Sequence, residues 1–332
     1  MSAFFYRRQH GFTMIELMVA MTMGLVITAG AVSLFLASKR SYNDIERSAR
    51  LQENGRAALY FLTRDLRHVN FWGDLIDVSN GLKAPDLNMT GTCSGWASST
   101  GANDLVSNRF VVSDNASADA FFTGCLNDIK ANTSAVAIKR VRAHDDSYTS
   151  AGFYNSLDAG DYFLRSNSGL GNIIAKGSTQ DTGALTAASE GKDWEYQPVI
   201  YFVRDFSVAD GDGIPSLCKV YGNPRMTTRC LVEGVEFLHI EYGLDTNTDG
   251  LADTYQPNDA AGTLDMSQVI TIRIYVLVRE LEQDFAYTNT NTYRMGSKTV
   301  TFSAGDNDRY HRALFTTTVI PQNQRTLPIT VN

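Results

Sequence analysis

Apolar and polar positions divide the chain into an N-terminal helical part and a body with a different pattern. The run from Leu17 to Ser38 carries no charged residue. At about 1.5 Å per residue, such a helix spans roughly 33 Å, enough to cross a hydrocarbon core of about 30 Å. From Leu51 onward, apolar residues recur every three, four or seven positions, which predicts an amphipathic helix. The residues of this stripe are Leu51, Ala58, Leu59, Leu62, Leu66 and Val69.

These two stretches predict one long helix over about residues 12–70, membrane-spanning over about 17–38 and amphipathic in its second half. No proline lies between Met1 and Lys83 to interrupt it. Gly55 is its expected weak point, because glycine is a poor helix former.

Beyond Trp72, short segments rich in Val, Ile, Tyr and Phe alternate with segments rich in Gly, Asn, Asp and Ser. This texture predicts strands and turns, and therefore an α+β protein whose body, residues 71–332, is a mostly antiparallel sheet. A loop-rich, variable part is expected over about 75–197 and a sheet core over about 198–320. Val269–Glu280 alternates most regularly and is the predicted central strand. The expected strands are Leu105–Val112, Ala135–Val141, Asp161–Arg165, Val199–Phe206, Leu231–Tyr242, Val269–Glu280, Lys298–Phe302 and Arg312–Val319.

Charges beside the apolar run bear on its orientation. Arg7 and Arg8 precede it and favour a cytoplasmic N-terminus, while Lys39 and Arg40 follow it and weaken the asymmetry. A secretory signal peptide would have an apolar region of only about 7–15 residues and then a cleavage site. This run is longer and continues into the amphipathic pattern.

Glu16 stands at the start of the apolar run. A carboxylate at the bilayer centre costs about 2.5–3.5 kcal/mol even by the lower estimates. An ordinary membrane anchor explains the length of the run but not this residue. One explanation of Glu16 is that its side chain lies near the helix end and extends to the membrane surface, where its carboxylate is hydrated.

The sequence GFTMIELMVAM, from Gly11 to Met21, resembles the N-terminal signature of type IV pilins and pseudopilins. The resemblance implies a leader of residues 1–11, cleavage by a prepilin peptidase between Gly11 and Phe12, and N-methylation of Phe12. It also implies that Glu16 meets the amine of Phe12 on a neighbouring subunit. Glu16 would then be costly in the lone subunit and satisfied in the assembly, which favours assembly and fixes its register. Many major pilins have a proline kink where this chain has Ser33.

Three further blocks, residues 51–73, 231–255 and 312–324, resemble the PilW-type minor pilins. The resemblance implies a precursor held in the inner membrane by one span, with its body in the periplasm, which later joins a pilus at the cell surface. Its implied partners are the prepilin peptidase, the pilus assembly platform, other minor pilins, the major pilin and a large tip adhesin. The implied role is in a tip or priming complex that supports adhesion, twitching motility or DNA uptake.

Three other functions stay open. A J-type pseudopilin of a type II secretion system would carry the same N-terminal signature. A surface binding module, an adhesin or DNA receptor, would use the helix only as its mount. An extracytoplasmic enzyme is the third, although no catalytic constellation is present, and we expect no enzyme activity.

The formal net charge is −7. Loss of residues 1–11 would remove the positive charges of Arg7 and Arg8 and make the remaining chain more acidic. This acidity argues against general nucleic-acid binding, which needs a basic surface.

The four cysteines are even in number and form no CxxC pair, which argues against a zinc site. A body outside the cytoplasm would keep disulfides. We expect Cys93–Cys125 and Cys218–Cys230, although four cysteines allow three connectivities. The second pair would join two adjacent strands. Free buried cysteines are the alternative.

The segment DTNTDGLAD has the spacing of the first part of a calcium loop. Its oxygen ligands would be the side chains of Asp245, Asn247, Asp249 and Asp253 and the carbonyl of Leu251. Position twelve is Gln256 rather than glutamate, so Glu241 and Asp259 are candidate additional ligands. No cofactor is required, but structural Ca²⁺ is one interpretation. The other is an Asx-rich turn whose side chains bind their own backbone.

GTCSG, residues 91–95, has the spelling of a nucleophile elbow around Cys93, but no apolar strand precedes it and no helix is expected after it. A disulfide cysteine in a loop is the preferred interpretation. The histidines are scattered, and His239, within an expected strand, is interpreted as structural.

Overall fold

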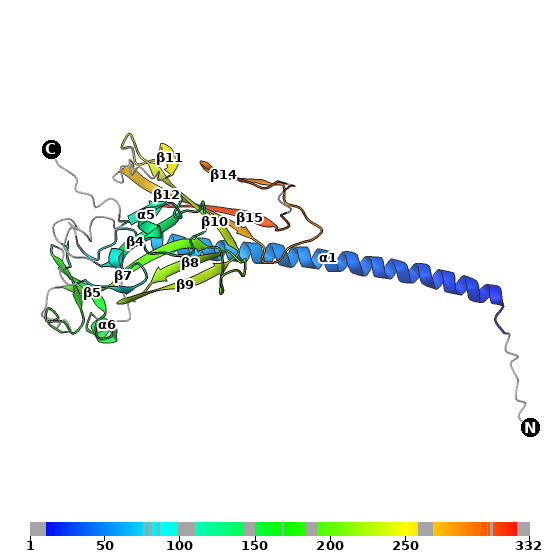
Figure 1. The fold of residues 1–332 in the computed structure, drawn as a ribbon, viewed down its shortest axis with the longest axis horizontal. Helices are drawn as coiled ribbons and strands as arrows, with labels where there is room; N and C mark the ends of the chain where they lie inside the picture. Colours follow the sequence, from blue (N-terminus) through cyan, green and yellow to red (C-terminus); the bar gives the residue numbers. More distant parts are fainter. Residues whose placement is uncertain are drawn as a thin grey trace, which may run out of the picture. The chain divides into compact units, whose positions relative to one another are not determined.

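The computed structural model describes residues 11–75, 78, 82–84, 87–98, 110–142, 150–167, 169–183, 191–257, 268–303, 305 and 308–323. The chain has two compact units, one ending at Arg50 and one beginning at Leu51. The predicted long helix is confirmed as α1 (Met14–Leu66), which is unbroken at Gly55 (Figure 1). Its first half is long and apolar enough to cross a membrane, and the side chains of this apolar stretch are exposed.

Within the described residues, the body contains a large, mostly antiparallel sheet of nine strands. The sheet runs in the order β1-β6-β5-β7-β8-β9-β2, while β4 pairs with β7 and β3 pairs with β4. Among the strand pairs of this sheet in the described residues, only the short pairs β1–β6 and β2–β9 are parallel. The strands are β1 (Leu82–Lys83), β2 (Thr90–Gly91), β3 (Phe110–Ser113), β4 (Ala135–Arg142), β5 (Tyr162–Ser166), β6 (Gly171–Ala175), β7 (Lys192–Arg204), β8 (Ser216–Tyr221) and β9 (Arg225–Glu233).

A second sheet of four antiparallel strands has the order β11-β10-β12-β15. Two more strands form a separate hairpin, and the described part of the chain has three short helices in the connections of the larger sheet. The strands are β10 (Val235–Leu244), β11 (Thr254–Pro257), β12 (Val269–Arg279), β15 (Arg312–Val319) and the hairpin strands β13 (Thr292–Met295) and β14 (Lys298–Thr301). The short helices are α3 (Ser94–Ala97), α5 (Ala120–Thr123) and α6 (Ser150–Ser156).

The core of the body follows the alternation of side chains along the strands. On β4, Val136 and Ile138 pack with the apolar stripe of α1 and with the four-stranded sheet. Ala137 and Val141 contribute to the cluster on the opposite face, to which α3 and α5 also contribute. Because neighbouring strand residues point to opposite faces, one strand serves both cores. The α+β class predicted from the sequence is therefore confirmed.

Most expected strands are present, with changes at their ends. The predicted central strand is confirmed as β12, which lies between β10 and β15. The expected strand Leu231–Tyr242 is wrong as a single element, because β9 ends and β10 begins on either side of Gly234. This glycine has φ +78°, and a Cβ there would lie 2.5 Å from the carbonyl oxygen of Arg279. The first part of the expected strand Leu105–Val112 lies outside the described residues.

The expected division of the body near residue 197 falls inside β7. Strands β4, β5 and β6 come from the part expected to be loop-rich, yet they share one sheet with β8 and β9. Strand β7 joins the two parts because it pairs with β4, β5 and β8. The sheet core is therefore built from both sides of residue 197.

Gly55 does not interrupt α1; it lies where the helix backbone comes close to Phe315. It is buried, and a Cβ there would lie 2.2 Å from the ring of Phe315 on β15. The helix needs a residue without a side chain here so that β15 can approach its backbone.

We therefore expect Gly55→Leu to lower the free energy of unfolding by about 2 kcal/mol, because overpacking costs up to about 3 kcal/mol and the gain in helix propensity is only about 1 kcal/mol. Denaturant unfolding of the full chain in a neutral detergent measures the change. Gly30→Leu is the matched control, since no atom lies within 4 Å of a Cβ at Gly30. On a Phe315→Ala background the cost should shrink, and an equal cost on both backgrounds would contradict the contact.

Candidate functional site

The N-terminal end of α1 places the residues expected for processing and assembly. Gly11 and Phe12 precede the helix, and Phe12 is 81% exposed. Residues 1–10 of the expected leader lie outside the described residues. Glu16 lies in the first turn and is exposed. A negative charge is favourable there, because the N-terminal end of a helix carries partial positive charge.

Thr13 caps this helix, which the sequence interpretation missed. Its hydroxyl accepts a hydrogen bond from the backbone N–H of Glu16 at 3.3 Å. The signal was available as Thr13-Met14-Ile15-Glu16, the spacing of a capping box. Within the apolar stretch, the hydroxyls of Thr22 and Thr28 donate to the carbonyls of Val19 and Gly24. The helix thus satisfies these polar groups itself, as a membrane span requires.

Asp65 fastens the second half of α1 to the large sheet. Its side chain is fully buried, and Oδ1 accepts a hydrogen bond from Arg140 of β4 at 2.7 Å. Its Oδ2 accepts from Lys219 of β8 at 2.8 Å and from the hydroxyl of Tyr201 of β7 at 2.7 Å. The charged residue on the apolar stripe was the available sequence signal, because a buried charge requires partners.

The Asp65 cluster holds its charges by mutual attraction. Burial by itself raises the pKa of Asp65, but Arg140, Lys219 and the hydrogen bonds outweigh burial, so the pKa lies below its ordinary value. Burial lowers the pKa of Lys219 and of Arg140, and Asp65 opposes both shifts. The carboxylate is therefore charged at neutral pH between two cations.

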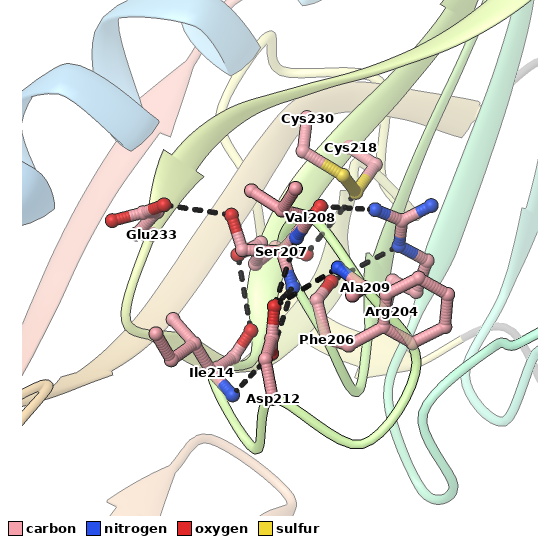
Figure 2. Close-up of a disulfide and its surroundings, with 11 residues drawn as sticks. Arg204, Phe206, Ser207, Val208, Ala209, Asp212, Ile214, Cys218, Cys230 and Glu233 are labelled. Atoms are coloured by element: carbon pink, nitrogen blue, oxygen red, sulfur yellow. Dashed lines mark hydrogen bonds between the residues drawn. A yellow bond between two sulfur atoms is a disulfide. The ribbon is translucent and has the colours of Figure 1, made fainter.

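Both expected disulfides are confirmed. Cys218 of β8 and Cys230 of β9 are bonded and face each other directly in the strand register (Figure 2). Cys93, before α3, is bonded to Cys125, after α5. A one-turn helix does follow Cys93, contrary to the sequence expectation. The sulfur of this cysteine is nevertheless in a disulfide, as expected for a structural residue.

The connection between β7 and β8 is closed by Asp212 (Figure 2). Its carboxylate accepts hydrogen bonds from the backbone N–H groups of Ser207, Val208, Ala209 and Ile214. The bond from Ile214 contributes most, and together these bonds lower the pKa of Asp212 to about 2. The residues beside the Cys218–Cys230 bridge thus form an ordered turn.

The loop expected to bind calcium holds its carboxylates in hydrogen bonds of its own. Asp245 accepts from the backbone N–H groups of Asp249 and Gly250, and Asp253 accepts from Thr246 and Asn247. Asp249 accepts from the N–H of Leu251. This is the network that an Asx-rich turn predicts. In the described ranges, no group of three His, Cys, Asp or Glu residues is placed to hold a metal ion, and calcium binding stays a prediction.

Glu241 belongs to a different cluster from this loop. Its carboxylate is buried and accepts hydrogen bonds from the N–H of Ser297 and the hydroxyl of Tyr275. His239 is buried beside it, with Nδ1 2.7 Å from Asp114 and Nε2 3.2 Å from the Ser297 hydroxyl. These contacts favour the structural interpretation of His239, which stays a prediction. The other candidate ligand, Asp259, lies outside the described residues.

Comparisons with known families give two matches, at opposite ends of the chain. Residues 200–323 match the family described as Type IV Pilus-assembly protein W. Residues 6–32 match the prokaryotic N-terminal methylation motif. No curated protein and no solved structure matches the chain. The two family matches confirm the resemblance inferred from the N-terminal signature and from the blocks 231–255 and 312–324.

Proposed function

We propose that this chain is a PilW-type minor pilin that is cleaved after Gly11, methylated at Phe12 and packed by α1 into a complex with other minor pilins; the two family matches support this. The observation that carries the proposal is α1 itself. One continuous helix has an exposed apolar first half and a second half that is built into the core of the body.

In this proposal the apolar first half of α1 lies first in the membrane and later among the helices of other pilins. It holds the precursor in the inner membrane, and it then packs among the helices of other pilins on the assembly platform. Glu16 pairs with the amine of Phe12 on a neighbouring subunit during this step. The body, 71–332, is then in the periplasm before assembly and at the cell surface afterwards.

A tip or priming position explains the size of the body. In such a complex the chain would start pilus assembly together with other minor pilins and the major pilin, and would present a large adhesin. Adhesion, twitching motility and DNA uptake would depend on it through the pilus. The match to a pilus-assembly family favours this role over a J-type pseudopilin.

The test is mass spectrometry of the N-terminal peptide of the chain recovered from its own membranes and pili. We expect a peptide that begins at methylated Phe12. The matched variant is Gly11→Leu, which should leave the chain starting at Met1 and absent from pili. If the unmodified chain also started at Met1 in cells that process other pilins, a plain membrane anchor for a soluble binding domain would replace the proposal.

A further inference from the structure

We propose that a pocket at the end of α1 binds a phosphate group, either as inorganic phosphate or on a small molecule. The pocket has a volume of about 340 Å³ and is here called the arginine pocket. Its walls come from α1 and the turn after it, from β4 and β7, and from the segment after β15. The lining residues are Arg64, His68, Phe71, Arg140, Arg142, Gln197, Gln322 and Asn323.

The first argument is an excess of positive charge. Arg140 contacts Asp65, and Arg142 contacts Glu195 at 3.0 Å. Arg64 lies 3.8 Å from Asp65, which also holds Lys219. Four cations therefore share two carboxylates at this place in a chain whose net charge is negative. A dianion in the pocket would balance the excess.

The second argument is an unused donor on a buried side chain. The Arg140 side chain is only 5% exposed, and its Nη2 donates to Asp65 and to the Gln197 side chain. Its Nε has no hydrogen-bond partner among the described residues. A buried N–H without a partner is costly, and the Arg140 side chain lines the pocket, so an acceptor that draws the guanidinium toward the pocket would relieve that cost.

The third argument is that hydrogen bonds fix the position of one wall of the pocket. The backbone N–H of Gln322 donates to the carbonyl of Arg67 at 3.0 Å. The side-chain amide of Asn70 donates to the carbonyl of Asn323 at 3.2 Å. These two bonds hold the segment after β15 against the turn after α1 and close one side of the pocket.

The chemistry of the lining selects a phosphate group. Arginine presents a planar set of donors that suits phosphate oxygens, and several arginines on different elements can meet different oxygens of one tetrahedral group. The lining carries guanidinium, amide and imidazole groups but no carboxylate. The volume exceeds that of a single water, about 30 Å³, by roughly tenfold, which leaves room for a substituent on the phosphate.

The experiment is calorimetric titration of the full chain in a neutral detergent with inorganic phosphate and with glycerol 3-phosphate, at constant ionic strength set with chloride. Binding of either probe supports the pocket. Tighter binding of glycerol 3-phosphate indicates a phosphate carried on a larger molecule, and binding of inorganic phosphate alone indicates the free anion. Heat that does not exceed the chloride control for either probe overturns the proposal.

Arg64→Gln and Arg142→Gln are the informative variants, because both side chains are about half exposed and their loss should change stability little. Each should raise the dissociation constant about tenfold, which is the effect of losing one charge-assisted hydrogen bond. Arg229→Gln removes the same charge from an exposed position on β9 outside the pocket and should leave binding unchanged. Equal weakening by all three variants would indicate a general charge effect and overturn the site.

Discussion

Replacing Asp65 with asparagine should lower the free energy of unfolding by about 3–5 kcal/mol, the cost of removing one partner from a buried ion pair. The change leaves Arg140 and Lys219 as buried cations without a counter-charge on α1. Asp65 also accepts a hydrogen bond from Tyr201 of β7, so it joins three strands to the helix and the loss is not confined to one contact. Denaturant unfolding of the full chain in detergent measures it.

Two further variants separate this cluster from a general effect of charge. Glu53→Gln removes an acid from an exposed position on the same helix and should change stability by less than about 0.5 kcal/mol. Combining Asp65→Leu with Arg140→Met and Lys219→Met should recover much of the loss, because apolar residues can replace a buried charge cluster. A single Asp65→Asn variant as stable as the parent would refute the role of the cluster.

The Asp65 cluster also predicts a dependence on pH. The pKa of Asp65 is lower in the folded chain than its ordinary value of about 3.9. Between those two values the unfolded chain binds more protons, so stability rises with pH in that window. The advantage of the parent over Asp65→Asn should therefore be constant above about pH 4 and decline as the pH falls through the folded pKa. Paired unfolding curves between neutral pH and pH 3 measure it.

The second large effect is expected from Glu16→Gln, which should leave cleavage after Gly11 intact and reduce incorporation into pili at least tenfold. Glutamine keeps the shape of the side chain but removes its charge. The amine of Phe12 on the neighbouring subunit would then enter an apolar helix bundle without a counter-charge, which costs several kcal/mol.

Quantitative immunoblotting of sheared pili against the membrane fraction measures incorporation, and the N-terminal peptide reports cleavage. Thr22→Val is the matched control, because the Thr22 hydroxyl donates to the Val19 carbonyl within its own helix turn. It should assemble normally. Normal assembly of the glutamine variant would show that Glu16 acts as a surface-reaching carboxylate or as a charge at the helix end.

Local patterns explain which parts of the fold could be predicted. The long helix follows from apolar spacing, and β12 follows from alternation, because both patterns reflect the geometry of a single element. The Cys218–Cys230 bridge joins neighbouring strands of one hairpin. It was predictable because its two cysteines are close in the sequence. Strands β6 and β13 were missed because they are short and lie between polar turns.

The Asp65 cluster could not be assembled from the sequence. Its partners lie on β4, β7 and β8, more than 70 residues away along the chain. The sequence shows a charge on an apolar stripe but not which distant cations meet it. The contact of Gly55 with Phe315 was misread for a similar reason, since helix propensity describes one helix and not the strand that packs on it.

The position of Asp65 has a mechanical consequence. Tension along α1 would reach the large sheet through the apolar packing of the helix and through one carboxylate whose three partners lie on the adjacent strands β4, β7 and β8. A pull along the helix would load these bonds together rather than one after another. Separation of helix from sheet would require them to rupture nearly at once, so the junction should resist stretching far better than any one of its bonds.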